Sequence, residues 1–217
     1  MYYSLISQFS TYSIALGVIV GWMRIKRVVP TYLPFLIILT LGLVNELISF
    51  FLIRGGHSNA VNGNIYSFIE SLLLLWQLKQ WGLLRHAPKF FYFIGALYIV
   101  VWCTENVIYF RPAKFSSFFN ATYAFCTVLM SISLINLLMG NDQGSLLKNP
   151  IFIFCTGMVL YYTYVVVIEL FYLYGVGSSK EFRRNLYHVH TYINLLSNLI
   201  YAAAFLWIPR KREFIQL

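Results

Sequence analysis

Four glutamates lie within long apolar stretches of the chain, where a carboxylate is costly. They are Glu46, Glu70, Glu105 and Glu169. An ionisable side chain inside a membrane span faces the bundle interior or a wet cavity and is a functional candidate by default. No lysine or arginine lies at the same depth to neutralise these carboxylates. If they meet, some of them are protonated or a cation is bound among them.

The apolar stretches define the class of protein. Of the 217 residues, 59% are hydrophobic and 11% are charged, whereas soluble domains are about 45–50% apolar and about 25% charged. The sequence therefore predicts an integral membrane protein, with the lipid bilayer as a partner. The formal net charge of +9 fits basic residues that flank membrane spans, so we do not expect nucleic acid as a partner.

Seven apolar runs are each about 20 residues long, which is enough to cross a bilayer core. The loops between them are short, which favours antiparallel neighbours in one bundle. Runs such as "LPFLIILTLGLV" do not alternate between polar and apolar residues, which argues against a transmembrane β-barrel. We predict an all-α, polytopic membrane bundle that forms a single domain over residues 1–217, with no soluble domain. The predicted spans are Ser4–Met23, Leu33–Ile53, Ile65–Leu84, Phe90–Phe110, Phe115–Leu138, Ile151–Tyr174 and Leu186–Ile208.

The basic residues predict the orientation of the bundle. "RIKR" (Arg24 to Arg27) follows the first span and no basic residue precedes it, which is typical of an uncleaved anchor and not of a removed signal peptide. Ten of the 16 basic residues fall on the side of the C-terminus and six on the other. Because cytoplasmic loops carry the excess of lysine and arginine, we expect the N-terminus outside and the C-terminus in the cytoplasm. Gly17 and Gly21 in the first span have the spacing of a close helix contact, within the bundle or between copies.

The polar residues of the spans share a depth in this sequence. Each of the four glutamates sits roughly 9–12 Å from the outer end of its predicted span, at 1.5 Å per residue. The seventh span carries "NLYHVHTYINLLSN", in which His190, Asn194, Ser197 and Tyr201 follow one helical face. We therefore predict one outward-facing layer of ligand-binding residues. Its members are Glu46, Glu70, Glu105, Asn120, Glu169, His190 and Asn194.

This layer has three functional interpretations besides a purely structural polar network. The first is a binding site for a cation or small polar ligand, because aromatic rings beside carboxylates suit organic cations. The protein would then be a sensor or a solute-binding membrane component, with a signalling partner protein or a homo-oligomer to carry the output. The second is a proton- or ion-coupled transporter or channel, because Glu and His relays mark such pathways.

The third interpretation is an intramembrane metal-dependent hydrolase. His188, His190 and Glu169 are the candidate metal ligands, with another glutamate as general base. However, two residues that are two positions apart on a helix point about 200° away from each other, and the chain contains no HExxH motif. The sequence thus favours a protein that is not an enzyme, and we expect no cofactor.

Two segments resemble those of small seven-helix inner-membrane proteins of bacteria. They are "NIYSFIESLLL", with its early Asn and Glu, and the terminal "LWIPRKREF". The resemblance covers most of the chain. It implies the topology and a location in the bacterial inner (plasma) membrane, and it implies no activity.

Overall fold

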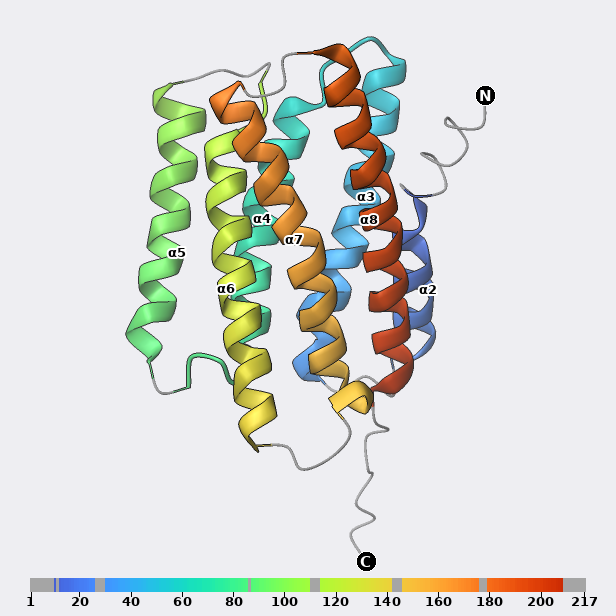
Figure 1. Cartoon of the computed structure of the whole chain (residues 1–217), viewed down its shortest axis with the longest axis vertical. Helices are drawn as coiled ribbons and strands as arrows, with labels where there is room; N and C mark the ends of the chain where they lie inside the picture. The colour runs from blue at the N-terminus through green and yellow to red at the C-terminus, as the bar shows by residue number, and fades with distance from the viewer. Residues whose placement is uncertain are drawn as a thin grey trace, which may run out of the picture.

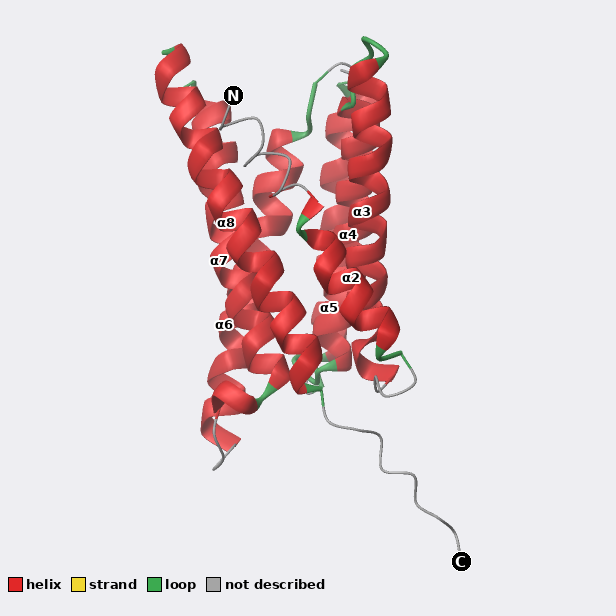
Figure 2. Ribbon diagram, turned by 90° about the vertical axis from the view of Figure 1, so that its right-hand side faces the viewer, coloured by secondary structure: helices red, strands yellow, loops and turns green. Residues whose placement is uncertain are grey.

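The computed structural model describes residues 10, 12–25, 30–85, 87–109, 114–141, 146–175 and 179–208. Within these ranges the chain forms seven α-helices and no strand, which confirms the all-α class. Figure 2 shows these helices and the loops that join them. A π-helical segment, Thr104–Ile108, continues α5, and short 3-10 turns precede α3 and α7. The helices are α2 (Ile14–Met23), α3 (Leu33–Arg54), α4 (Ala60–Gln80), α5 (Pro88–Cys103), α6 (Ser117–Asn141), α7 (Pro150–Tyr174) and α8 (Lys180–Trp207).

Five stretches of helix are long and apolar enough to cross a membrane. This supports the expectation of an integral membrane protein. Two helices are not among these five stretches. Helix α2 is shorter than a span in the described residues, and the beginning of the predicted span Ser4–Met23 lies outside those residues. Helix α4 carries a larger share of polar residues than the five stretches do. The five stretches are Pro30–Arg54, Pro88–Ile108, Ser117–Gly140, Pro150–Tyr174 and Arg184–Trp207.

Successive helices run up and down along one common axis (Figure 1). Six of them form a closed ring in the order α2, α3, α4, α6, α7, α8, because each packs against the next and α8 packs against α2. Helix α5 stands outside this ring. Its extensive contacts with other α-helices are those with α4 and α6. We call the end of the bundle where α3 ends and α4 begins the upper end, as it is drawn in Figure 1.

The first and last described helices are joined by side-chain hydrogen bonds. The hydroxyl of Ser10 donates to the carbonyl of Thr191 (2.5 Å), and the guanidinium of Arg24 donates to carbonyls at the end of α8, including that of Phe205 (2.8 Å). A methyl group at Gly17 would lie 2.8 Å from Leu39 of α3. The small residues of α2 therefore make a contact within the bundle.

The lower end of the bundle is closed by an aromatic cluster. The ring of Phe35 lies 4.5 Å from that of Phe154 and 5.0 Å from that of Tyr201. Gln77, which is fully buried, fixes the start of α3: its amide oxygen accepts from the backbone N–H of Phe35 and its amide nitrogen donates to the carbonyl of Thr31, both at 2.7 Å. These residues pack α3, α4, α7 and α8 together in the lower half of the bundle.

Two helices begin earlier than the apolar pattern predicts, because polar residues continue each helix above its apolar part. Helix α4 begins at Ala60 and α8 at Lys180, where Ser179 caps the first turn by accepting from the N–H of Phe182 (3.1 Å). Glu70 thus lies ten residues into α4, about 15 Å from its upper end. Asn120 lies only three residues into α6, about 5 Å. The polar residues therefore differ in their distance from the start of their own helices.

Candidate functional site

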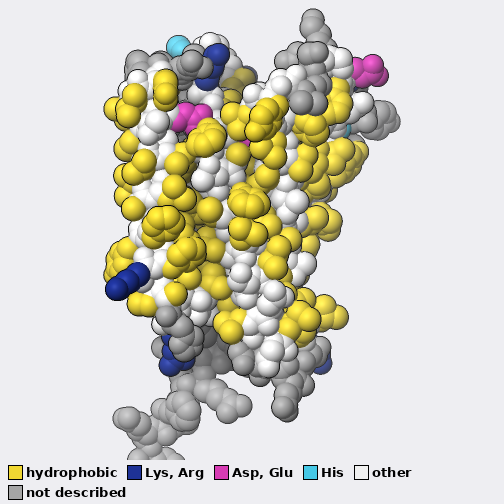
Figure 3. All heavy atoms as spheres, turned by 60° about the vertical axis from the view of Figure 1, so that its left-hand side comes forward, with side chains coloured by type: hydrophobic (Ala, Val, Ile, Leu, Met, Phe, Trp, Pro, Cys, Tyr) yellow, Lys and Arg dark blue, Asp and Glu magenta, His cyan; other side chains and the backbone are white. Residues whose placement is uncertain are grey.

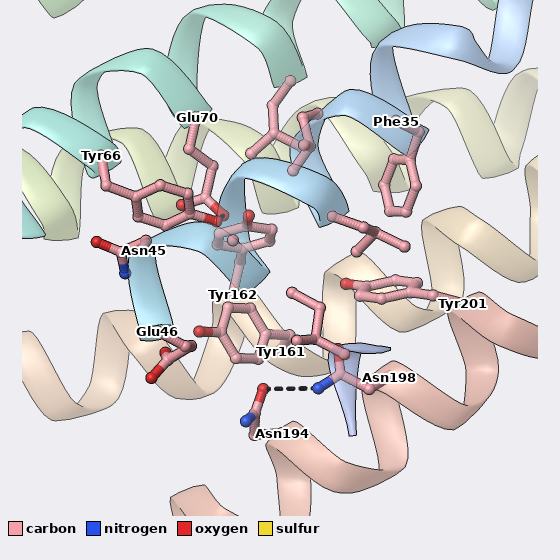
Figure 4. A pocket seen from close by; sticks show the side chains of 15 residues that line it. Phe35, Asn45, Glu46, Tyr66, Glu70, Tyr161, Tyr162, Asn194, Asn198 and Tyr201 are labelled. Carbon is pink, nitrogen blue, oxygen red and sulfur yellow. Dashed lines mark hydrogen bonds between the residues drawn. The ribbon is translucent and has the colours of Figure 1, made fainter. Parts of the chain in front are cut away.

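A cavity of about 80 Å³ lies inside the ring, between α2, α3, α4, α7 and α8. Three of the predicted site residues line it, namely Glu46, Glu70 and Asn194. Figure 4 shows Glu46 and Glu70 on opposite sides of a group of tyrosines, with Asn194 and Asn198 reaching in from α8. The remaining lining residues are Ile14, Phe35, Ile38, Leu39, Gly42, Asn45, Tyr66, Leu74, Tyr161, Tyr162 and Tyr201.

Glu70 is the buried anchor of this cavity, with 8% of its surface exposed. Both of its carboxylate oxygens accept a hydrogen bond from a phenol at 2.9 Å: Oε1 from Tyr66, one helical turn earlier on α4, and Oε2 from Tyr123 of α6. Tyr162 of α7 lies in the same cavity wall. Hydrogen bonds from α4 and α6 thereby hold one acidic group in a fixed position.

Glu46 is the open acidic group of the cavity. It is half-buried on α3, and none of the described residues donates a hydrogen bond to its carboxylate. Tyr66 and Tyr161 are close enough to interact with it electrostatically. Within the described ranges, no lysine or arginine acts on either Glu46 or Glu70. The cavity therefore carries two acidic groups without a basic counter-charge.

The polar face of α8 closes the cavity on the side of α2. The amide nitrogen of Asn198 donates to the hydroxyl of Ser13 (2.9 Å) and to Oδ1 of Asn194 (3.3 Å). The amide nitrogen of Asn194 lies 3.4 Å from the carbonyl oxygen of Ser10. These amides serve two roles, because they hold α2 against α8 and present polar atoms to the cavity.

Glu105, Asn120 and Glu169 form a separate cluster and do not line the cavity. Glu105 belongs to the π-helical end of α5, outside the ring, and its two oxygens accept from the backbone N–H groups of Phe118 (3.3 Å) and Phe119 (2.8 Å). An acceptor at this position stabilises a helix start, whose first N–H groups lack partners within the helix. Glu105 is thus a cap for α6.

Asn120 and Glu169 join α6 to α7 within this second cluster. The amide nitrogen of Asn120 donates to Oε1 of Glu169 (3.1 Å), and Ser117 and Glu105 also act on this carboxylate. Oδ1 of Asn120 is buried and has no hydrogen-bond partner among the described residues. Residues of the predicted layer are therefore divided between the cavity and this second cluster, which includes Glu105 from α5, outside the ring.

His190 lies beside the cavity and not in its wall. Its imidazole packs between the rings of Tyr161 (5.8 Å) and Tyr164 (5.9 Å, 17° between planes). In the part of the chain that the structure describes, no three His, Cys, Asp or Glu side chains are grouped so that they could hold a metal ion. The structure therefore does not bring together the candidate metal ligands His188, His190 and Glu169. A hydrolytic metal centre has no support from this geometry.

The tyrosines were not among the predicted ligand-binding residues, although Tyr201 was placed on the polar face of the seventh span. Tyr66, Tyr161, Tyr162 and Tyr201 line the cavity and Tyr123 bonds its buried carboxylate. Tyr66 precedes Glu70 by four residues, a spacing that places two side chains on one helical face, so the sequence itself pairs these two. Tyr123 and Tyr162 come from other helices, and nothing in a single sequence pairs them with Glu70.

Comparisons with known proteins add no relative. The chain matches no protein-family model, no curated protein and no solved structure.

Proposed function

We propose that the chain is an integral membrane protein whose central cavity binds a small monovalent cation of the ammonium type. The observation that carries the proposal is the pairing of Glu46 and Glu70 in one tyrosine-lined cavity without a basic partner among the described residues. Two such carboxylates are costly in a low-dielectric interior unless they are protonated or bind a positive charge. A cation between them removes that cost.

The size and lining of the cavity select the kind of cation. At about 80 Å³ it is far smaller than the roughly 300–1,000 Å³ of typical small-molecule sites, so it suits an ion or an amine of a few atoms. Tyrosine faces attract ammonium groups. Divalent metals in proteins take six or more oxygen ligands in many sites, and one of the two carboxylates here, that of Glu70, is already held by two tyrosine hydroxyls. An ammonium or methylammonium ion fits the composition best.

The proposed topology is seven spans, including α2 and α4, with the upper end outside and the C-terminus in the cytoplasm of a bacterial inner membrane. The bias of basic residues supports this orientation. The aromatic cluster of Phe35, Phe154 and Tyr201 contributes Phe35 and Tyr201 to the lower wall of the cavity, which favours access from the upper, outward side. The protein would then report the cation to a signalling partner or a second copy.

Binding is tested by thermal unfolding of the purified protein with ammonium, methylammonium, Na⁺, K⁺, Mg²⁺ or Ca²⁺ chloride at equal ionic strength. A ligand at a hundredfold excess over its Kd stabilises the folded state by about 2.7 kcal/mol. We expect the largest shift with ammonium or methylammonium. Glu46→Gln and Glu70→Gln should each abolish that shift, because glutamine keeps the size of the side chain but not its charge.

Glu181→Gln is the matched control, because Glu181 is exposed in the first turn of α8 and is absent from the cavity wall. It should respond to the cation as the parent does. If both cavity variants are more stable than the parent and no salt raises the unfolding temperature of any of the proteins, the cavity residues are a structural network and the binding proposal fails.

A coupled transporter is the second candidate function, and one feature of α6 favours it. Thr127 and Ser131 follow Tyr123 at successive turns toward the lower end and are buried, and Oγ of Ser131 has no hydrogen-bond partner among the described residues. These side chains form a row of polar groups that continues from Glu70 into the lower half of the bundle. Uptake of methylammonium into proteoliposomes distinguishes the two functions, because a binding protein saturates at one ion per chain whereas a transporter accumulates many.

A further inference from the structure

A second and larger hollow lies outside the ring, near the upper end of the bundle. It has a volume of about 670 Å³ and is bounded by the end of α5, the start of α6 and the end of α7. Its walls include Val100, Glu105, Lys114, Phe118 and Leu173. This volume falls in the range of sites for organic ligands. We call it the α5–α7 groove.

Hydrogen bonds fix the wall of the groove between α5 and α6. Oδ1 of Asn106, in the π-helical segment, accepts from the amide of Asn64 (3.0 Å) and from the hydroxyl of Ser116 (2.8 Å). Asn64 also donates to the carbonyl of Lys114 (3.0 Å). Single π-helical turns within α-helices occur frequently at functional sites. The groove is therefore held open by polar contacts between three segments.

The groove presents one charge of each sign. Glu105 keeps free lone pairs beyond the two backbone N–H groups that it accepts, and the side chain of Lys114 is exposed. Among the described residues, no ion pair joins these two side chains or engages either of them. Figure 3 shows acidic and basic side chains near the upper end of a face that is otherwise largely hydrophobic. A ligand that carries both charges is complementary to this pair.

The groove wall also carries apolar side chains that are exposed. Val100 is 62% exposed, Phe118 is 57% exposed and Leu173 is 42% exposed. The charged pair lies at helix ends, which is the level of the lipid headgroups in a membrane bundle. A ligand with a charged head and apolar chains can occupy both parts at once.

We propose that the α5–α7 groove binds a zwitterionic phospholipid that bears a primary amine, of the phosphatidylethanolamine class. Its ammonium group donates to Glu105, its phosphate contacts Lys114, and its acyl chains follow Val100, Phe118 and Leu173. A glycerol headgroup would satisfy Lys114 but offers no cation to Glu105. A choline headgroup is cationic but has no N–H to donate. This site is independent of the cation cavity.

The test measures lipid retention on delipidated protein by native mass spectrometry, with phosphatidylethanolamine, phosphatidylcholine and phosphatidylglycerol of identical acyl chains. The parent should retain phosphatidylethanolamine about tenfold better than the other two, which corresponds to one charge-assisted hydrogen bond. Lys114→Gln should weaken retention of phosphatidylethanolamine and phosphatidylglycerol alike. Glu105→Gln should remove the preference between these two lipids.

A neighbouring pair of substitutions separates the groove from the general lipid surface. Val100→Trp fills the groove and should reduce retention of phosphatidylethanolamine about tenfold, whereas Ile99→Trp, at an exposed position that does not line the groove, should leave it unchanged. Neither changes the α6 cap, so the comparison holds even if Glu105→Gln unfolds the protein. Equal retention by the two Trp variants, or of the three lipids by the parent, overturns the proposal. Displacement of the lipid by an equal concentration of soluble phosphoethanolamine would show that the site takes the free headgroup and not the lipid.

Discussion

Removal of single phenol groups around Glu70 measures how strongly the cavity holds its buried acid. Tyr66 and Tyr123 each donate to one oxygen of Glu70 at 2.9 Å, so Tyr66→Phe and Tyr123→Phe each delete one hydrogen bond and little volume. A hydrogen bond to a charged group contributes about 1.5–3 kcal/mol. Bonds between neutral side chains of membrane helices average about 0.6 kcal/mol. The two charge states of Glu70 thus predict different losses.

We expect each substitution to lower the free energy of unfolding by about 2 kcal/mol if Glu70 is a carboxylate. The loss should be larger for Tyr123→Phe, because its hydrogen bond is fully buried whereas that of Tyr66 is partly buried. The assay is equilibrium unfolding in mixed micelles, with helical circular dichroism as the signal. Tyr192→Phe is the control, because Tyr192 is half exposed and should lose less than about 0.5 kcal/mol, as surface substitutions usually do.

A double-mutant cycle with Glu70→Gln identifies the source of the loss. Because residues in contact couple by about 0.5–3 kcal/mol, each Tyr→Phe change should cost less when Glu70 is already Gln. If the losses are no greater than that of Tyr192→Phe and the coupling energy is near zero, the view that this carboxylate joins α4 to α6 is refuted.

Two further predictions concern a helix start and the topology. Gln77→Leu leaves the N–H of Phe35 and the carbonyl of Thr31 without partners, at about 1–3 kcal/mol each, and should lower the unfolding free energy by at least about 2 kcal/mol. Gln80→Leu, at an exposed position of the same helix, is the control and should be nearly neutral. Equal losses in the two variants would contradict the capping role of Gln77. An epitope tag after Leu217 should be protected from protease added to intact cells, and its cleavage there would reverse the proposed orientation.

The sequence predicts the helices well, because the apolar runs record burial and lipid contact directly. Helix α3 was expected to begin at Leu33 and does so, and α7 ends at Tyr174 as predicted. The errors fall at the starts of α4 and α8, where Ala60 and Lys180 begin the helices within polar sequence. Hydropathy marks the apolar part of a helix and contains no signal for the polar turns that extend it.

The candidate site was predicted only in part, for a topological reason. Helical spacing identifies which residues share a face, and it placed Glu70 and Asn194 toward the interior correctly. It does not show which helices meet. Since α5 packs outside the ring, Glu105 became a cap for α6 and not a wall of the cavity.

The closure of the ring by α2 and α8 has a consequence for the biogenesis of the protein. The hydrogen bond between Ser13 and Asn198 joins positions 185 residues apart, and the cavity is lined by Ile14 from the first described helix and by Tyr201 from the last. Chains are synthesised and inserted from the N-terminus at about 5–20 residues per second. In the proposed topology, α2 therefore waits for roughly 10–40 seconds at those rates before its last neighbour emerges. During that interval Ser10 and Ser13, just before α2, have no partner on α8, and the acidic side of the cavity on α3 and α4 is not yet covered.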